Sequence, residues 1–272
     1  MATARPAQLP PPDDAAWTNW LVLAGRGFGK TRLAMEDAWW YGATHPDTRV
    51  ALIAATYADA RDTMVEGESG LLALIPDGML GAWNRSLGEL TLANKTRYKL
   101  FAATEPERLR GPQHHRAYCD ELAAWQYEET WDQMLFGLRL GRDPKVVIAT
   151  TPKPTPLVRR IVKDGHTIVT RGSTFDNAAN LAPSAIEQLK AKYDGTRLGR
   201  QELYAEILDD VAGALWTRDM FDRNRVRECP DLVRVVVAID PSGTGGADDG
   251  GDSIGIVVAG KGADGRAYVL AD

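Results

Sequence analysis

Leu21-Val-Leu-Ala-Gly-Arg-Gly-Phe-Gly-Lys-Thr31 is the stretch of this chain that decides its fold. A short apolar run stops there in a glycine-rich turn, and a helix-compatible segment follows, which gives the order strand, loop and helix. Glycines allow backbone N–H groups to converge on phosphate oxygens, and the N-terminus of the following helix adds partial positive charge. The pattern therefore predicts a phosphate-binding loop rather than an ordinary glycine-rich turn.

The residues of this loop are the predicted nucleotide-binding residues of the chain. Lys30 is expected to reach the outer phosphates, and the Thr31 hydroxyl is expected to bind Mg²⁺. Ala24 replaces the first glycine of the usual pattern and is small enough to keep the turn tight. The predicted set is Ala24, Gly25, Arg26, Gly27, Phe28, Gly29, Lys30 and Thr31.

The composition is that of a folded protein with a substantial core. With 272 residues and 44% hydrophobic content, the chain can hold one large domain, or one domain and part of another. Its two cysteines, Cys119 and Cys229, are too few for a disulfide framework or a zinc site, so we expect a reducing, intracellular setting. No apolar run has the length to span a bilayer, and the N-terminus lacks the profile of a signal peptide.

The charge is distributed unevenly along the chain. The net charge of −5 argues against a protein that coats nucleic acid broadly. Residues 151–200 nevertheless carry nine Lys and Arg against four Asp and Glu, whereas residues 201–272 carry seven against fourteen. This asymmetry is compatible with one face that meets a polyanion, and equally with two ordinary solvated faces.

Strand and helix patterns alternate along most of the chain. Buried strands are expected at residues 17–24, 50–55, 97–102, 116–119, 145–150 and 166–171. Helices are expected at residues 31–41 and 121–140, and within residues 183–208. This alternation predicts an α/β fold with a mostly parallel central sheet flanked by helices.

The pattern changes near both ends of the chain, which predicts the domain boundaries. Residues 1–16, with three consecutive prolines, read as a flexible arm, and the α/β domain covers residues 17–208. Residues 209–231 are irregular and charged, as expected of a linker. Within residues 232–272, three further strands at 232–239, 254–259 and 266–271 are joined by tight turns, which predicts a meander.

An acidic pair, Asp120 and Glu121, ends the strand expected at residues 116–119. A carboxylate that closes a strand near a phosphate-binding loop is suited to hold Mg²⁺, which predicts that role for Asp120. Hydrolysis also needs a base that orients and activates water in line with the terminal phosphate, and Glu121 is the candidate. A helix N-cap with an acidic first turn is the alternative interpretation.

Two threonines and two arginines complete the candidate site. Thr150 and Thr151 end the next clear strand, where ligands of parallel sheets bind, so they are candidate sensors of the terminal phosphate. They could equally be a strand terminator. Negative charge on the transferred phosphoryl group calls for an arginine, which Arg26 within the loop or Arg110 on a turn next to a glycine can supply. Arg110 could reach the nucleotide of a neighbouring subunit, although solvation is the default for a loop arginine.

At this point the chain resembles the large subunit of the terminases that package DNA in tailed phages. Besides Trp20 and the loop after it, the matching segments are Val50-Ala-Leu-Ile-Ala-Ala-Thr-Tyr-Ala-Asp-Ala-Arg61, Arg108-Leu-Arg-Gly-Pro-Gln113, Asp120-Glu-Leu-Ala-Ala-Trp125, Ile148-Ala-Thr-Thr-Pro152 and Ala238-Ile-Asp-Pro241. Their order and spacing extend over nearly the whole chain, which is more specific than any single motif. Prophages and gene-transfer agents carry the same type of protein, so the source stays open.

The resemblance implies an ASCE-type P-loop ATPase that forms a homo-oligomeric ring on the portal protein of an empty capsid and pumps double-stranded DNA inward. It implies ATP as substrate, Mg²⁺ as cofactor and the small terminase subunit as a partner, with no membrane involved. The expected location is the cytoplasm of the host cell, with transient docking on the procapsid. Ring size and the way packaging begins stay open.

The resemblance also assigns roles to residues. Lys30 and Thr31 are implied to bind phosphate and Mg²⁺, Asp120 to hold the metal, and Glu121 to be the catalytic base. Thr150 and Thr151 look like the coupling motif of the family. Arg110 resembles its trans-acting arginine, and Arg26 matches the arginine often found inside its loop.

Family members carry a C-terminal RNase H-like endonuclease that cuts concatemeric DNA. Asp240, at the end of a predicted strand, looks like its first metal-binding carboxylate, and Asp252 is a possible second. Two-metal cleavage needs several carboxylates, and no counterpart of the later ones is visible before Asp272. We therefore expect residues 232–272 to be the opening strands of an incomplete nuclease domain, inactive in this chain. A capped turn at Asp240 is the alternative.

Contact with DNA is expected from basic residues that follow the candidate sensor threonines. These residues are Lys153, Arg159, Arg160 and Lys163. Contacts to backbone phosphates make binding sensitive to salt and nearly independent of sequence. Two other functions stay open: a P-loop helicase or other nucleic-acid-dependent ATPase, and a non-catalytic assembly subunit whose docking is gated by nucleotide.

Overall fold

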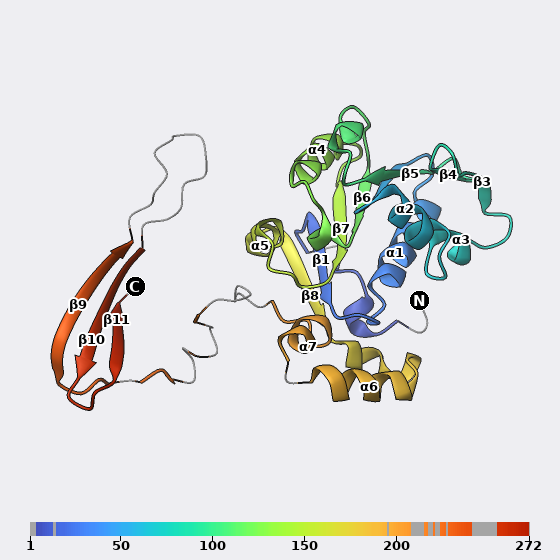
Figure 1. Ribbon diagram of the computed structural model, residues 1–272. Coiled ribbons are helices and arrows are strands. Elements are labelled where there is room, and N and C mark those ends of the chain that lie inside the picture. Colours follow the sequence, from blue (N-terminus) through green and yellow to red (C-terminus); the bar gives the residue numbers. More distant parts are fainter. Residues whose placement is uncertain are drawn as a thin grey trace. The chain divides into compact units, whose positions relative to one another are not determined.

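The computed structural model describes residues 4–12, 15–194, 196–207, 215–216, 220, 224–226, 228–240 and 255–271. The chain divides into two compact units, Met1–Asp209 and Asp210–Asp272, and each is described by itself. The first unit holds the glycine-rich loop and every helix of eight or more residues that the described ranges contain (Figure 1).

The first unit is built on an eight-stranded sheet with the order β3-β4-β5-β2-β6-β7-β1-β8 (Figure 1). Its strands are β1 (Asn19–Ala24), β2 (Arg49–Ala54), β3 (Leu80–Asn84), β4 (Glu89–Leu92), β5 (Arg97–Ala102), β6 (Arg116–Asp120), β7 (Lys145–Thr150) and β8 (Thr167–Gly172). The pairings from β5 through β8 are parallel, whereas β3–β4 and β4–β5 are antiparallel. The mostly parallel α/β fold is therefore confirmed.

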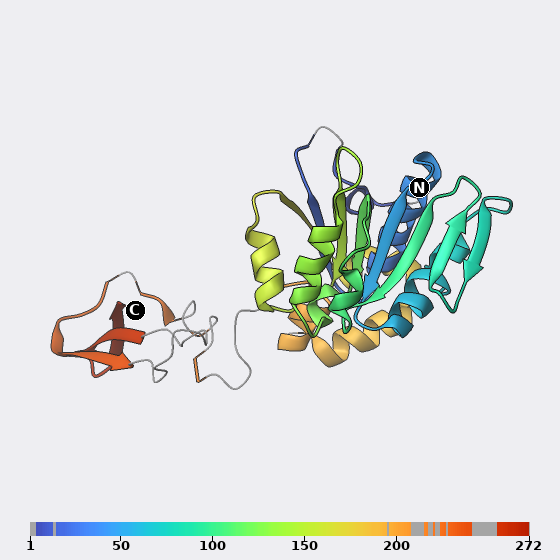
Figure 2. The ribbon, with the colours of Figure 1, turned by 90° about the horizontal axis from the view of Figure 1, so that it is seen from above.

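Helical elements cover both faces of this sheet (Figure 2). One face packs against α1 (Lys30–Thr44), the π-helix η2 (Ala60–Val65) and α3 (Leu71–Leu74). The other packs against η3 (Pro106–Leu109), η4 (Leu122–Ala124), α4 (Glu129–Gly137) and α5 (Pro156–Lys163). The remaining elements are η1 (Pro6–Gln8), α2 (Tyr57–Asp59), η5 (Thr174–Asn180), α6 (Pro183–Tyr193) and α7 (Arg197–Glu202).

The central strands explain why both faces are covered. All six residues of β1 and all six of β7 are buried. Along β1, Trp20 and Val22 enter the core on the α1 side, while Leu21 and Leu23 enter the core on the α4 side. A strand that is apolar on both sides stays out of water only when helices cover both faces of the sheet. The continuous apolar runs in the sequence follow from this arrangement.

Several predicted elements differ from the structure. The helix expected at residues 121–140 is only a short 3-10 turn and α4, because Glu121 has a left-handed backbone (φ 44°, ψ 47°) that no α-helix contains. Residues 203–207, expected to be helical, follow the end of α7. The edge strand β3 and its neighbour β4 were not expected, because both are short and β3 is mostly exposed.

The N-terminal segment also differs from the expected flexible arm. Residues 4–12 belong to the first unit and contain the short 3-10 helix η1. The Arg5 guanidinium lies over the Phe28 ring, 4.7 Å from its centroid. This contact places the segment directly against the glycine-rich loop.

The second unit contains a three-stranded antiparallel sheet with the order β11-β10-β9. Its strands are β9 (Leu232–Asp240), β10 (Gly255–Gly262) and β11 (Ala267–Ala271), at the positions where the meander was expected. The tight turn expected between the first two of these strands, and most of the linker expected at 209–231, lie outside the described residues. Among the described helices of the whole chain, none has the length and apolar content to cross a membrane.

A buried histidine makes the stability of the first unit dependent on pH. His114 is 2% exposed, and its ring packs edge-on against Phe101 with 5.4 Å between centroids. Burial lowers the pKa of His114 to about 4, and the positive charge of Arg49 adds to this effect. In the unfolded chain the His114 imidazole takes up a proton near pH 6.5, whereas in the folded chain it does so only near pH 4. The contribution of His114 to the stability of the fold is therefore complete above pH 6.5 and is lost as the pH falls toward 4.

We expect the free energy of unfolding to fall by about 2 kcal/mol between pH 7 and pH 5 through His114 alone. The measurement is urea denaturation of the wild type and of His114→Gln at both pH values. The wild type should lose more stability than the variant by about this amount. His166→Gln, which changes an exposed histidine, is the control and should behave like the wild type. An equal loss in His114→Gln and wild type would contradict the prediction.

Candidate functional site

The order of the strands places the predicted site residues at one edge of the sheet. β6, β7 and β1 are neighbours and parallel, so their carboxyl ends meet. Asp120 ends β6, Thr150 ends β7, and the glycine-rich loop follows β1. Three segments that are far apart in the sequence therefore converge where ligands of parallel sheets bind.

The loop has the backbone conformation that its glycines allow. Gly27 (φ 73°) and Gly29 (φ 95°) are both left-handed, and α1 begins directly afterwards at Lys30. Other residue types adopt such angles only at a cost, so glycine is needed at both positions. The loop borders a cavity of about 520 Å³, within the usual size of ligand sites. Its lining includes Lys30, Thr31, Glu121 and Thr151.

Lys30 is buried at the floor of this cavity. Its ammonium donates to the backbone carbonyls of Ala24 at 3.0 Å and Gly25 at 3.3 Å. The same Nζ atom lies 3.6 Å from Oε1 of Glu121. A buried ammonium that exchanges carbonyl contacts for phosphate oxygens gains charge-assisted hydrogen bonds. Lys30 is thus placed as the sequence predicts for a phosphate-binding lysine.

Thr31 and Asp120 form the oxygen pair expected of a metal site. The Thr31 hydroxyl donates to Oδ1 of Asp120 at 3.4 Å. Burial raises the pKa of Asp120 to about 7, and the neighbouring Glu121 adds to the rise, against the opposing charge of Lys30. A hydroxyl and a carboxylate are hard oxygen donors, which Mg²⁺ prefers. These residues therefore fit a magnesium ion, whose positive charge would stabilise the buried carboxylate.

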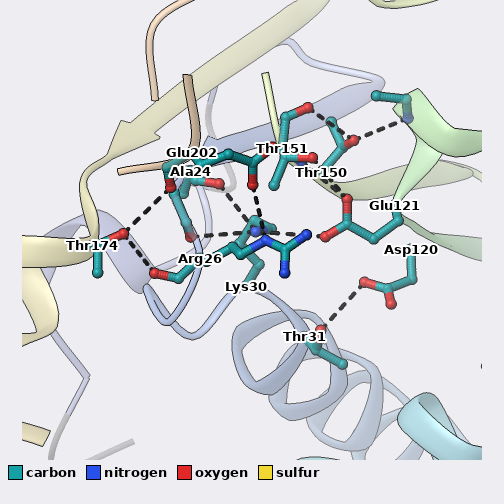
Figure 3. A network of polar contacts seen from close by, with 12 residues as sticks. Ala24, Arg26, Lys30, Thr31, Asp120, Glu121, Thr150, Thr151, Thr174 and Glu202 are labelled. Carbon is teal, nitrogen blue, oxygen red and sulfur yellow. Dashed lines mark hydrogen bonds and ion pairs between the residues drawn. The ribbon is translucent and has the colours of Figure 1, made fainter. Parts of the chain in front are cut away.

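The two threonines at the end of β7 hold the segment that carries Glu121 (Figure 3). Oε2 of Glu121 accepts from the Thr151 hydroxyl at 3.1 Å and from the Thr151 backbone N–H at 3.2 Å. Thr150 Oγ1 accepts from the Ala123 N–H at 3.0 Å, which fixes the turn after Glu121. The predicted sensor and the predicted base are therefore in direct contact.

The loop arginine is paired with an acidic residue that the sequence did not single out. Arg26 Nε lies 2.9 Å from Oε2 of Glu202, at the end of α7 (Figure 3). The Arg26 side chain is 80% exposed, whereas that of Glu202 is 14% exposed. The Arg26 N–H also donates to the Glu202 carbonyl at 2.9 Å. Glu202 lines the cavity. Sequence reasoning did not predict it as a site residue, because it lies 176 residues after Arg26 in the chain.

The remaining candidates do not all join this site. Arg110 is exposed on the turn after η3, where its guanidinium lies 3.3 Å from Oε2 of Glu107, and it does not line the cavity. Lys153, predicted above as a DNA contact, lines the cavity beside the loop, and its contact with DNA stays a prediction. Arg159, Arg160 and Lys163 are exposed on α5, and Arg160 pairs with Asp132 at 3.3 Å.

The predicted nuclease residues lie in the second unit. Asp240 is exposed at the last position of β9, opposite Gly255 of β10. Asp252 lies outside the described residues. Within the described ranges, no group of three or more His, Cys, Asp and Glu side chains is placed to hold a metal. The role of Asp240 therefore stays a prediction.

A larger hollow, of about 810 Å³, lies elsewhere on the first unit, with Arg97, Lys99 and His114 among its lining residues. None of the loop residues lines this larger hollow, so the smaller cavity beside the loop is the candidate site.

The chain matches one known family over residues 21–223, described as the terminase large subunit, T4likevirus-type, N-terminal. This chain belongs to the terminase large-subunit family. The match begins within β1 and extends beyond α7, so it includes the loop, Asp120, Glu121 and both threonines. The family resemblance inferred from the motifs is thereby confirmed. No curated protein shows a significant match to this terminase chain.

Solved terminase structures share its fold. The ATPase domain of the large terminase of Thermus phage P74-26 has a TM-score of 0.56 at 15% identity, over 72% of this chain and 90% of that one. The large terminase of a thermophilic bacteriophage, in complex with ADP, has a TM-score of 0.60 at 14% identity over 98% of this chain. The HK97 bacteriophage large terminase has a TM-score of 0.58 at 16% identity over 95% of this chain. The terminase chain described here spans 65% of the ADP-bound protein and 60% of the HK97 protein.

Proposed function

We propose that this chain is the ATP-hydrolysing motor part of a viral terminase that translocates double-stranded DNA into a preformed capsid. The observation that supports this most is the position of Glu121, whose carboxylate lies 3.6 Å from the Lys30 ammonium and is held by Thr151. Hydrolysis of ATP needs a water molecule oriented toward the terminal phosphate. A carboxylate beside the loop cavity is suited to orient that water and accept its proton.

Magnesium belongs to this proposal as the cofactor. When bound, it neutralises charge on the phosphates and helps to position them. The chain's own contribution is the pair of oxygen ligands from Thr31 and Asp120, which lie 3.4 Å apart. Lys30 contributes a fixed positive charge, and the loop amides contribute hydrogen-bond donors.

The contact between Thr151 and Glu121 suggests how hydrolysis is coupled to DNA movement. Thr151 directly follows β7, and the next helix, α5, begins only five residues later at Pro156. The Thr155 side chain caps α5 by accepting from the Val158 N–H at 3.3 Å. A change at the Glu121 carboxylate thus reaches α5 through one short segment. We infer that the exposed basic residues of α5 touch the DNA backbone.

The wider assembly extends the same proposal. We infer that subunits form a ring on the portal protein, that the small terminase subunit is a partner, and that Arg110 acts on the nucleotide of a neighbouring subunit. Its exposure on a turn before Gly111 (φ 113°) supports a role outside its own chain. We further propose that β9, β10 and β11 belong to an RNase H-like nuclease with Asp240 as a metal ligand.

An ATPase assay with and without duplex DNA tests the central proposal. Mg²⁺-dependent turnover that duplex DNA stimulates is the expected result. Unwinding of a forked duplex would favour a helicase instead. Nucleotide binding without turnover, even in the presence of DNA and portal protein, would favour a nucleotide-gated assembly subunit. Binding to duplex DNA should weaken steeply with salt, because phosphate contacts release counterions.

The pair formed by Arg26 and Glu202 gives a separate prediction. Glu202 is a nearly buried carboxylate in the cavity lining, so it repels the phosphates unless Arg26 compensates for its charge. We expect Glu202→Gln to bind Mg²⁺ and ATPγS about three- to fivefold more tightly, measured by calorimetry. Glu206→Gln, which removes an exposed carboxylate paired with Arg200, is the control. Unchanged or weaker binding in Glu202→Gln would refute this account.

A further inference from the structure

Two consecutive carbonyl groups of the phosphate-binding loop are bound by side chains from one distant segment. Thr174 donates its hydroxyl hydrogen to the Arg26 carbonyl with 2.6 Å between oxygens. Asn177 donates from Nδ2 to the Gly27 carbonyl at 2.6 Å. Both residues belong to η5, about 150 residues after the loop, as their separation of 148 and 150 positions shows. Thr174 is 1% exposed, so this bond is enclosed by protein.

The next carbonyl of the loop is bound by the N-terminal segment. Arg5 donates from Nη2 to the Phe28 carbonyl at 2.5 Å, and Gln8 donates from Nε2 to the same oxygen at 3.3 Å. Arg5 also donates to Oδ1 of Asn177, and to the Asp176 carbonyl at 3.0 Å. The N-terminal segment and η5 are therefore cross-linked into one brace around the outside of the loop.

The direction of these bonds fixes the direction of the loop amides. In a trans peptide, the carbonyl oxygen and the N–H of the following residue point in opposite directions. Carbonyls of residues 26, 27 and 28 that face the brace therefore aim the N–H groups of Gly27, Phe28 and Gly29 away from it. The Phe28 N–H donates to the Gly25 carbonyl at 3.3 Å. Within the described part of the chain, the N–H groups of Gly27 and Gly29 donate to no backbone carbonyl.

We propose that Thr174, Asn177 and Arg5 are positioning residues that hold the loop amides ready for phosphate before the nucleotide arrives. The inference rests on the proposed function, because it assumes that the loop binds a nucleoside triphosphate. A loop with glycines at positions 25, 27 and 29 loses much backbone freedom when it orders around a ligand. Because the brace orders the loop when the chain folds, this entropy is lost before the nucleotide binds. Less of the binding free energy is then needed to order the loop.

The test measures nucleotide affinity and turnover in variants of the brace. Asn177→Asp has the same size but no N–H to donate, and Thr174→Val has the same shape without the hydroxyl. For both, calorimetry with Mg²⁺ and ATPγS should give a Kd about tenfold higher than for the wild type. The KM for ATP should rise similarly while kcat at saturation stays within about twofold, because the brace does not touch the reacting atoms. Thr174→Ser should restore wild-type values.

One control and one further variant separate positioning from loss of fold. Gln188→Glu adds a negative charge to an exposed residue of α6 and should leave Kd and KM unchanged. Arg5→Met changes the segment outside the sheet, so it tests the brace if Thr174→Val unfolds. Wild-type affinity in Asn177→Asp and Arg5→Met would overturn this inference alone. A lower kcat with unchanged KM would also overturn it. No binding of ATPγS by the wild type would instead overturn the proposed function.

Discussion

Glu121→Gln is expected to lose ATP turnover by a factor of about 10² to 10⁴, the usual contribution of a general base. Glutamine has the size of glutamate, and its amide oxygen can still accept from the Thr151 hydroxyl, which now bonds Oε2 at 3.1 Å. It cannot take a proton from water, so chemistry fails while the site keeps its shape. Affinity for Mg²⁺ and ATPγS should stay within a few-fold of the wild type.

The comparison should include variants that separate the base from its support. Glu187→Gln, on the exposed side of α6, is the matched control and should turn over normally. Thr151→Val removes the hydroxyl that holds the carboxylate, so it should lose less activity than Glu121→Gln, and Thr151→Ser should recover it. Full turnover in Glu121→Gln would exclude Glu121 as the base.

The second large effect is expected at Lys30. Lys30→Ala should weaken binding of Mg²⁺ and ATPγS by about 10²-fold and leave no measurable turnover. The substitution removes the positive charge that lowers the pKa of Asp120 against the effects of burial and of Glu121. The carboxylates of Asp120 and Glu121 would then face the phosphates without the positive charge of Lys30. Calorimetry and a phosphate-release assay measure the two quantities.

Lys30→Met tests whether charge or shape matters at this position. Methionine fills nearly the same space without the ammonium, so it should behave like Lys30→Ala. Lys261→Met, at an exposed position of the second unit, is the control and should bind normally. Retention of wild-type affinity in both Lys30 variants would remove the basis of the nucleotide site.

Sequence reasoning located the parts of the site that lie at the ends of buried strands. β1 and β7 are apolar on both faces, so their limits are clear in the sequence, and the polar residues after them mark the ligand edge of the sheet. Asp120 ends a more polar strand, yet its distance from the loop motif was sufficient to predict its place in the site. These local signals give the loop, the acidic pair and the two threonines.

The residues that sequence reasoning missed act through long-range contacts. Glu202, Thr174 and Asn177 reach the loop across about 150 to 176 residues of chain, as their hydrogen bonds show. Nothing in their immediate neighbours indicates such a contact, because the fold alone brings η5 and α7 back to β1. Sequence reasoning missed the role of Arg5 for another reason, because a segment rich in proline is typical of a flexible arm.

The backbone of Glu121 has a consequence for the stability of this chain. A glutamate at φ 44° is strained by about 1–2 kcal/mol relative to glycine, which adopts such angles freely. Glycine would relieve this strain but has no carboxylate, so the proposed role of Glu121 as the base comes at a cost in stability. We expect Glu121→Gly to melt at a higher temperature than Glu121→Gln, in a thermal scan of the two inactive variants, by a few degrees.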